Sequence, residues 1–183
     1  MRTPKQSTPL GVIASGFAAG LVGTACMDTV RFLRQRRSED GVRNPLRWEF
    51  ARVHGWQEAP DPGQVAKRLV EGFTQRKLPD ATAWPISTVM HWVYGAAGGA
   101  LYGVVAGSAR KPRVVYGLPF GALVCIGGYA VLPIAGLYRP IWKYDGKTLS
   151  EDLTAHLAYG AATSTSFWLC TKACAVAWSR ATE

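Results

Sequence analysis

The chain has 183 residues and a formal net charge of +9, with 48% hydrophobic and 18% charged residues. This length suggests a single domain over residues 1–183. The charges are clustered and the apolar residues form long runs, a distribution that favours membrane helices over a soluble core. The basic residues lie beside the apolar runs, where they would meet anionic headgroups, so nucleic acid is set aside as a partner.

The four cysteines do not form a disulfide framework or a zinc site. The cysteines are Cys26, Cys125, Cys170 and Cys174, and they all lie inside apolar runs. They form no CxxC pair and do not have the spacing of a zinc finger. We interpret them as small buried apolar residues.

Four stretches are long and apolar enough to cross a bilayer, whose core of about 30 Å requires about 20 residues of helix. We expect these transmembrane helices at about residues 9–30, 84–108, 114–138 and 153–178. The sequence therefore predicts an all-α membrane protein with four transmembrane helices.

The first stretch has a second interpretation as a signal peptide, since Arg2 and Lys5 precede it. The sequence Gly23-Thr24-Ala25-Cys26 also resembles a lipoprotein cleavage site, but Gly23 stands where such sites usually have Leu. We therefore expect a first membrane helix here.

The connection over residues 31–83 is the longest and begins with basic residues from Arg31 to Arg37. Within it, Asp61-Pro62-Gly63-Gln64 predicts a helix start, with Asp61 as N-cap and Pro62 at the first helical position. The apolar spacing that follows predicts a short amphipathic helix at about residues 62–76. We expect it to lie on the membrane or against the bundle.

Each expected membrane helix carries a row of small residues at a spacing of four, which lines one helix face. Such faces let helices approach closely in lipid, where apolar burial gives no drive for association. The glycines that we expect at helix contacts are Gly16, Gly20, Gly95, Gly99, Gly103, Gly117, Gly121 and Gly160.

The pattern H-x-x-Y-G occurs twice, at His91 to Gly95 and at His156 to Gly160, each time near the start of a helix. The first and third helices also share their glycine rows. We therefore interpret the chain as two helix pairs related by a parallel pseudo-repeat.

Several of these motifs carry a resemblance to a known family. They are His91-x-x-Tyr94-Gly95, Pro133-Ile-Ala-Gly136-Leu137, Leu149-Ser150-Glu151 before His156, the stretch 61–79, and Arg139-Pro-Ile-Trp-Lys-Tyr-Asp145. From about Asp61 to the end of the last helix, the chain resembles the YagU-like family of bacterial inner-membrane proteins, in an actinobacterial-type form. The resemblance implies a multi-helix protein of the bacterial plasma membrane and supplies no catalytic residues.

Ionisable and tyrosine side chains form a candidate polar cluster toward one membrane face, because the helix ends that carry them meet there. Its members are Asp28, His91, Tyr94, His156, Tyr159 and Glu151. Ionisable residues in membrane segments are costly and mark candidate functional sites.

Three interpretations of this cluster remain open. Its members can tie the helices together by hydrogen bonds, or they can form a proton- or ion-handling site, since histidine titrates near neutrality. Alternatively, His91 and His156 can hold a metal or a b-type haem from opposing helices. No HExxH, Walker or GxSxG motif is present, so we expect no enzyme activity and no cofactor.

We therefore expect a non-catalytic accessory subunit that associates with other membrane proteins or with itself. A small transporter is the alternative. Ten basic residues flank the helix ends on the side of the long connections and six flank the other, which favours long connections in the cytoplasm.

Overall fold

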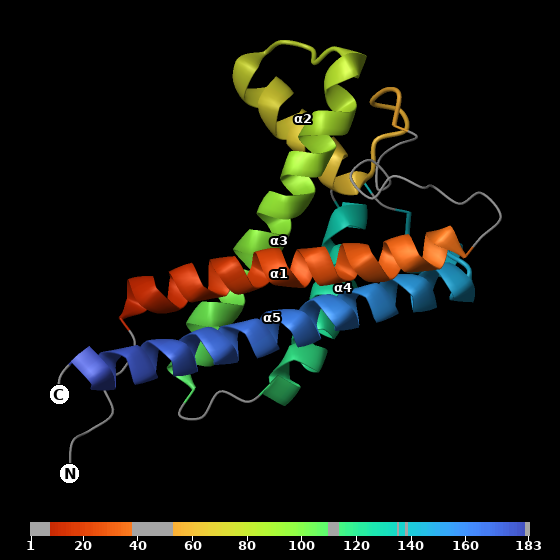
Figure 1. Cartoon of the computed structure of the whole chain (residues 1–183). Coiled ribbons are helices and arrows are strands. Elements are labelled where there is room, and N and C mark those ends of the chain that lie inside the picture. Colours follow the sequence, from red (N-terminus) through yellow and green to blue (C-terminus); the bar gives the residue numbers. More distant parts are fainter. Residues whose placement is uncertain (1–7, 38–52, 110–113, 135, 138, 182–183) are drawn as a thin grey trace. The chain divides into compact units, whose positions relative to one another are not determined.

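A computed structural model describes residues 8–37, 53–109, 114–134, 136–137 and 139–181. This part of the chain is helical and contains no strand (Figure 1). Its α-helices are α1 (Pro9–Arg36), α2 (Asp61–Thr74), α3 (Ala83–Ser108), α4 (Gly117–Ile134) and α5 (Gly146–Ala181). Three short 3-10 helices accompany them: η1 (Asp80–Thr82), η2 (Val114–Tyr116) and η3 (Ile141–Lys143).

The chain divides into two compact units, and each long helix contributes residues to both. The first unit comprises Met1–Met27, Gly95–Val124 and His156–Glu183. The second comprises Asp28–Tyr94 and Cys125–Ala155. The basic turn at 110–113, the N-terminal Arg2 and Lys5, and residues 38–52 of the long connection lie outside the described residues.

In the first unit, glycines bring helix backbones into direct contact. A Cβ added to Gly20 of α1 would lie 2.5 Å from the carbonyl oxygen of Gly95 in α3 and 2.9 Å from the Cα of Gly99. In the same unit, a Cβ on Gly160 of α5 would lie 2.7 Å from the backbone nitrogen of Gly121 in α4. The eight glycines expected at helix contacts all lie this close to another helix.

Aromatic side chains fill the remaining core of the first unit. The ring centroids of Tyr102 and Phe120 are 4.9 Å apart, and Phe167 meets Tyr102 edge-on at 5.8 Å. Ala19 and Ala106 complete this buried cluster. Because the alanine side chains are small, the aromatic rings fit between helices whose backbones are elsewhere in direct contact.

In the second unit, Trp56 anchors the segment before α2. Its indole Nε1 donates to the carbonyl oxygen of Pro79 at 3.0 Å, and its backbone nitrogen donates to Oδ1 of Asp80 at 3.1 Å. The ring packs with Ala59 and Ala83. The long connection therefore contains a small core of its own.

The start of α2 differs from the expectation. The helix begins at Asp61 with Pro60 as N-cap, so the assignment of Asp61 as N-cap is wrong by one residue. The side-chain amide of Gln64 donates to the carbonyl oxygens of Trp56 and Ala59. The preceding segment satisfies this side chain, which ties α2 to the Trp56 core.

The end of α4 and the start of α5 also differ from the expected positions. α4 ends at Ile134 rather than near 138, because Gly136 adopts a φ of 67° and forms a Schellman cap. In this cap Leu137 N donates to Leu132 O at 2.9 Å. α5 begins at Gly146 rather than near 153, because Asp145 accepts from the backbone N of Thr148 and caps the helix.

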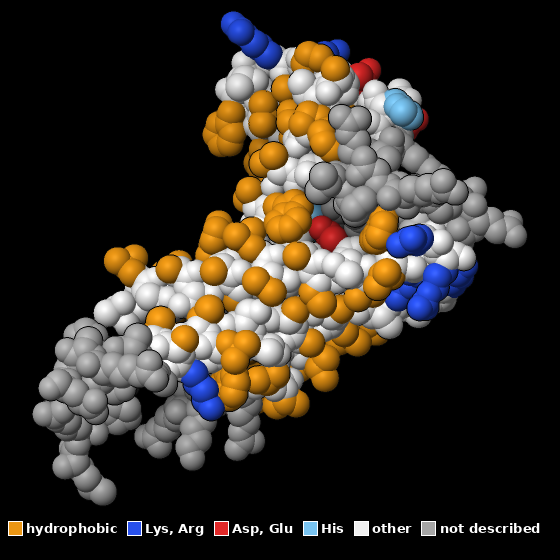
Figure 2. Space-filling view, in the orientation of Figure 1, with side chains coloured by type: hydrophobic (Ala, Val, Ile, Leu, Met, Phe, Trp, Pro, Cys, Tyr) orange, Lys and Arg blue, Asp and Glu red, His pale blue; other side chains and the backbone are white. Residues whose placement is uncertain are grey.

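Within the part of the chain that the structure describes, two helices are long and apolar enough to cross a membrane, namely α1 and the segment Val114–Ile134, which comprises η2 and α4. Among the described residues, α3 and α5 do not meet this criterion: glycines and His91 lie along α3, and His156 and the Thr and Ser residues at 163–166 lie along α5. Figure 2 shows hydrophobic side chains spread over the visible surface of the long helices.

Candidate polar site

The second unit contains a buried carboxylate–imidazole pair. Nε2 of His91 in α3 lies 3.0 Å from Oδ1 of Asp28 in α1. An ionised carboxylate only accepts, so the imidazole donates from Nε2. Both residues are buried, with Asp28 at 9% and His91 at 8% exposure. A charge held away from water requires such a partner, which explains why the two residues occur together.

A second polar cluster lies one helical turn further along α1. Nη2 of Arg31 is 3.4 Å from Oδ1 of Asp152 in α5, and the hydroxyl of Tyr129 in α4 donates to Oδ2 of the same carboxylate at 2.5 Å. Asp152 thus joins three helices of this unit. Tyr144 packs edge-on against the Tyr129 ring at 5.2 Å.

Arg34 extends this cluster toward the end of α1. Its Nη1 donates to the backbone oxygen of Glu151 at 3.0 Å, and its Nη2 donates to Oγ1 of Thr154 at 2.7 Å. Glu151 therefore contributes its carbonyl here. These contacts also give a reason why α1 continues to Arg36 instead of ending near residue 30.

The other predicted members have different surroundings. Tyr94 is 54% exposed, whereas Tyr159, at the equivalent place of the second H-x-x-Y-G motif, is 3% exposed. Within the first unit, the Tyr159 hydroxyl donates to the carbonyl oxygen of Gly95 at 2.7 Å. His156 is half-buried in that unit, where its carbonyl oxygen lies against Gly121.

The structure brings Asp28 and His91 together within one unit and places His156 in the other. A site that contains all three stays a prediction. The same holds for a bis-His haem or a metal.

Sequence reasoning missed the partners of this site more than its members. Arg31 and Arg34 were expected in the connection after the first membrane helix, and Tyr129 was not among the expected members of the cluster. The spacing of the two arginines does indicate a polar helix face. Asp28, Arg31 and Arg34 recur every three residues, so they share one side of a helix. Continuing the helix past the apolar run would have revealed this polar face.

Comparisons with protein-family models, with curated proteins and with solved structures find no match for this chain.

Proposed function

We propose that the chain is a multi-pass inner-membrane protein of the YagU-like type, in which α1, α3, α4 and α5 cross the bilayer. It works without catalysis, as an accessory subunit that associates with other membrane proteins or with a second copy. The long connections face the cytoplasm.

The length and surface of α3 support its assignment as a membrane span. α3 has 26 residues, and at 1.5 Å per residue a helix of that length reaches about 39 Å, more than the bilayer core. Leu101 and Val105 of α3 are 62% and 66% exposed. Side chains of this kind are suited to contact with acyl chains.

The glycine contacts support the pseudo-repeat. Within the first unit, α1 meets α3 where Gly20 lies against the carbonyl oxygen of Gly95, and α4 meets α5 where Gly117 lies against the carbonyl oxygen of Gly160. Matching these contacts aligns Asp28, eight residues after Gly20, with Cys125, eight residues after Gly117. On this alignment, a cysteine of the second helix pair stands where the first pair has the carboxylate.

The observation that carries an associating rather than a transporting role is the backbone-close packing of the glycine rows. A substrate pathway along these helix interfaces would need the space that Gly16, Gly20 and Gly99 leave to neighbouring backbone. Nearby, the Tyr159 hydroxyl donates to the carbonyl oxygen of Gly95 and so ties α5 to α3. The helices thus behave as a rigid element with an apolar exterior.

Purification in mild detergent followed by native mass spectrometry tests this proposal. We expect a heteromer or a homo-oligomer that survives dilution. A strictly monomeric chain that carries out transport after reconstitution would overturn it.

A proton- or ion-handling role is the second candidate, and the buried Asp28–His91 pair favours it. Histidine beside a carboxylate can exchange protons near neutral pH. In liposomes that contain a trapped pH dye, the transport role predicts flux that Asp28→Asn and His91→Gln abolish while the protein stays folded. The absence of flux in the unaltered protein would exclude it.

A further inference from the structure

The two ends of α2 have different surroundings. Toward its start, Gly63 and Ala66 are buried, and a Cβ on Gly63 would collide with the hydroxyl of Ser87 in α3. Toward its end, Leu69 is 50% and Phe73 is 88% exposed. Leu69 and Phe73 are four residues apart and share one helix face. The helix is therefore already docked on α3 and still presents a free apolar edge.

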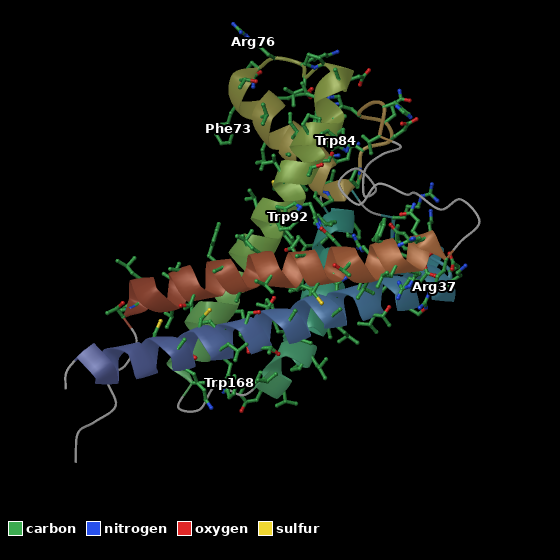
Figure 3. The ribbon with its side chains drawn as sticks, viewed as in Figure 1. Arg37, Phe73, Arg76, Trp84, Trp92 and Trp168 are labelled. Atoms are coloured by element: carbon green, nitrogen blue, oxygen red, sulfur yellow. The ribbon has the colours of Figure 1, made fainter. Side chains whose placement is uncertain are left out.

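Basic residues surround this edge. Arg76 and Lys77 follow the C-terminus of α2 and are exposed, and Arg68 is exposed within the helix. Figure 3 shows Phe73 and Arg76 pointing away from the ribbon. An apolar aromatic side chain beside cationic ones is the composition that favours the boundary between headgroups and acyl chains.

A second segment of the same unit repeats this composition. In η3, Trp142 is 80% and Ile141 is 43% exposed. Arg139, Lys143 and Lys147 flank them and are exposed. Tryptophan is enriched at membrane interfaces because its ring is amphipathic.

A hydrogen bond connects α2 with the chain just before the second segment. Nη2 of Arg68 donates to the carbonyl oxygen of Gly136 at 3.4 Å. Both segments also belong to connections that emerge on the same membrane face when α1, α3, α4 and α5 all cross the bilayer. Two separate stretches of sequence thus supply the same pairing of an exposed aromatic ring with basic side chains.

We propose that these two segments form one docking surface for anionic phospholipids, which we call the interfacial surface. It consists of Leu69, Phe73, Arg76 and Lys77 from the α2 segment, and Arg139, Ile141, Trp142 and Lys143 from the η3 segment. Phe73 and Trp142 enter the boundary between headgroups and acyl chains, and the basic side chains meet lipid phosphates. This inference rests on the proposed membrane location and adds the class of lipid that the chain selects.

Charge and exposure favour lipid over an acidic protein partner. A protein interface concentrates its aromatic residues in a desolvated centre with a polar rim. Here each aromatic side chain stands on its own segment with two or more basic residues within five positions. This repeated arrangement suits an extended anionic plane.

Photo-cross-linking of the full-length chain tests the interfacial surface. Benzoylphenylalanine replaces Phe73 or Trp142, whose exposure makes the exchange tolerable, and a control places it at the exposed Gln57. The protein is reconstituted into vesicles of phosphatidylcholine alone, or of phosphatidylcholine and phosphatidylglycerol in equal parts. We expect lipid adducts at positions 73 and 142 well above those at 57. They should increase several-fold with phosphatidylglycerol and decrease at high salt, as Debye screening requires.

Charge removal tests the lipid class separately. Combining Arg76→Gln and Lys77→Gln with the label at 73 should abolish the preference for phosphatidylglycerol and leave a basal lipid adduct. Adducts at 73 and 142 that equal the control, or that join only to protein, would overturn the interfacial surface. Extraction of the chain by alkaline carbonate would instead overturn the membrane location, so the two failures are distinguishable.

Discussion

The two units of the molecule hold their helices together by opposite means. In the first unit, helices touch through glycines such as Gly20 and Gly99, where the absence of a side chain permits contact. In the second, helices are connected by specific polar side chains, with Asp28 paired to His91 and Asp152 to Arg31. The first unit should therefore be sensitive to added volume, and the second to lost hydrogen-bonding groups.

The largest effect should come from Gly99→Leu. A Cβ at this position would collide with the Cα of Gly20 and lie 2.5 Å from the carbonyl oxygen of Gly16, so the helices must separate. We expect loss of folded protein, with overpacking that costs about 1–3 kcal/mol or more. Yield and thermal unfolding in detergent measure the change.

Gly127→Leu is the matched control for Gly99→Leu. Gly127 lies in α4, and a Cβ there would meet nothing within 4 Å. Leucine also exceeds glycine in helix propensity by about 0.5–1 kcal/mol, so this variant should be neutral or stabilised. Equal behaviour of the two variants would contradict the proposed difference between occupied and open glycine faces.

A smaller loss should follow Asp152→Ala in the second unit. The substitution leaves Arg31 and the Tyr129 hydroxyl without this carboxylate and should cost about 1–2 kcal/mol, because both side chains at the ion pair are partly exposed and screened. A double-mutant cycle with Arg31→Ala measures the coupling. A coupling energy near zero would show that the Arg31–Asp152 contact does not stabilise the unit.

His91→Gln should have a still smaller effect on stability. The amide can donate to Asp28 in place of Nε2, so we expect a cost below about 1 kcal/mol. His91→Leu, which leaves the buried carboxylate unpaired, should be clearly worse. Identical unfolding temperatures for the two variants would mean that the hydrogen bond does not matter.

The smallest effect concerns the start of α5. The backbone N of Thr148, and then its hydroxyl, donate to Asp145 and hold the pKa of that carboxyl below its usual value. Its contribution is complete above the unfolded pKa and is lost as the pH falls through the folded pKa. The protection factor of the Thr148 amide, the ratio of the intrinsic exchange rate to the observed rate at the same pH, should therefore decrease on acidification, and Asp145→Asn should remove that pH dependence. An unchanged protection factor across the acidic range would refute the cap.

Much of the helical content could be predicted, because membrane-length apolar runs and glycine rows are strong local signals. α2 and α3 begin within a residue or so of their expected starts. The ends of α1, α4 and the start of α5 could not be predicted from apolarity. Tertiary contacts of Arg34, the positive φ of Gly136 and the cap by Asp145 determine them.

The polar site was predictable in its members and not in its pairing. Asp28 and His91 were grouped because charges inside apolar runs require partners, and they are paired. The link from Asp152 to Arg31 joins residues 121 positions apart, and sequence alone offers no signal for such a contact. The repeated H-x-x-Y-G pattern also predicted equivalent places for Tyr94 and Tyr159, although Tyr94 is exposed and Tyr159 is buried.

The Trp56 core has a consequence for biogenesis. Its hydrogen bonds to Pro79 and Asp80 span 23 and 24 residues. Contacts of such short range form early because little chain must be closed into a loop. The core can therefore be complete while the ribosome is still synthesising α4 and α5. In a nascent chain arrested after α3, the fluorescence of Trp56 should already be protected from soluble quenchers. The later helices would then fold after the Trp56 core is complete.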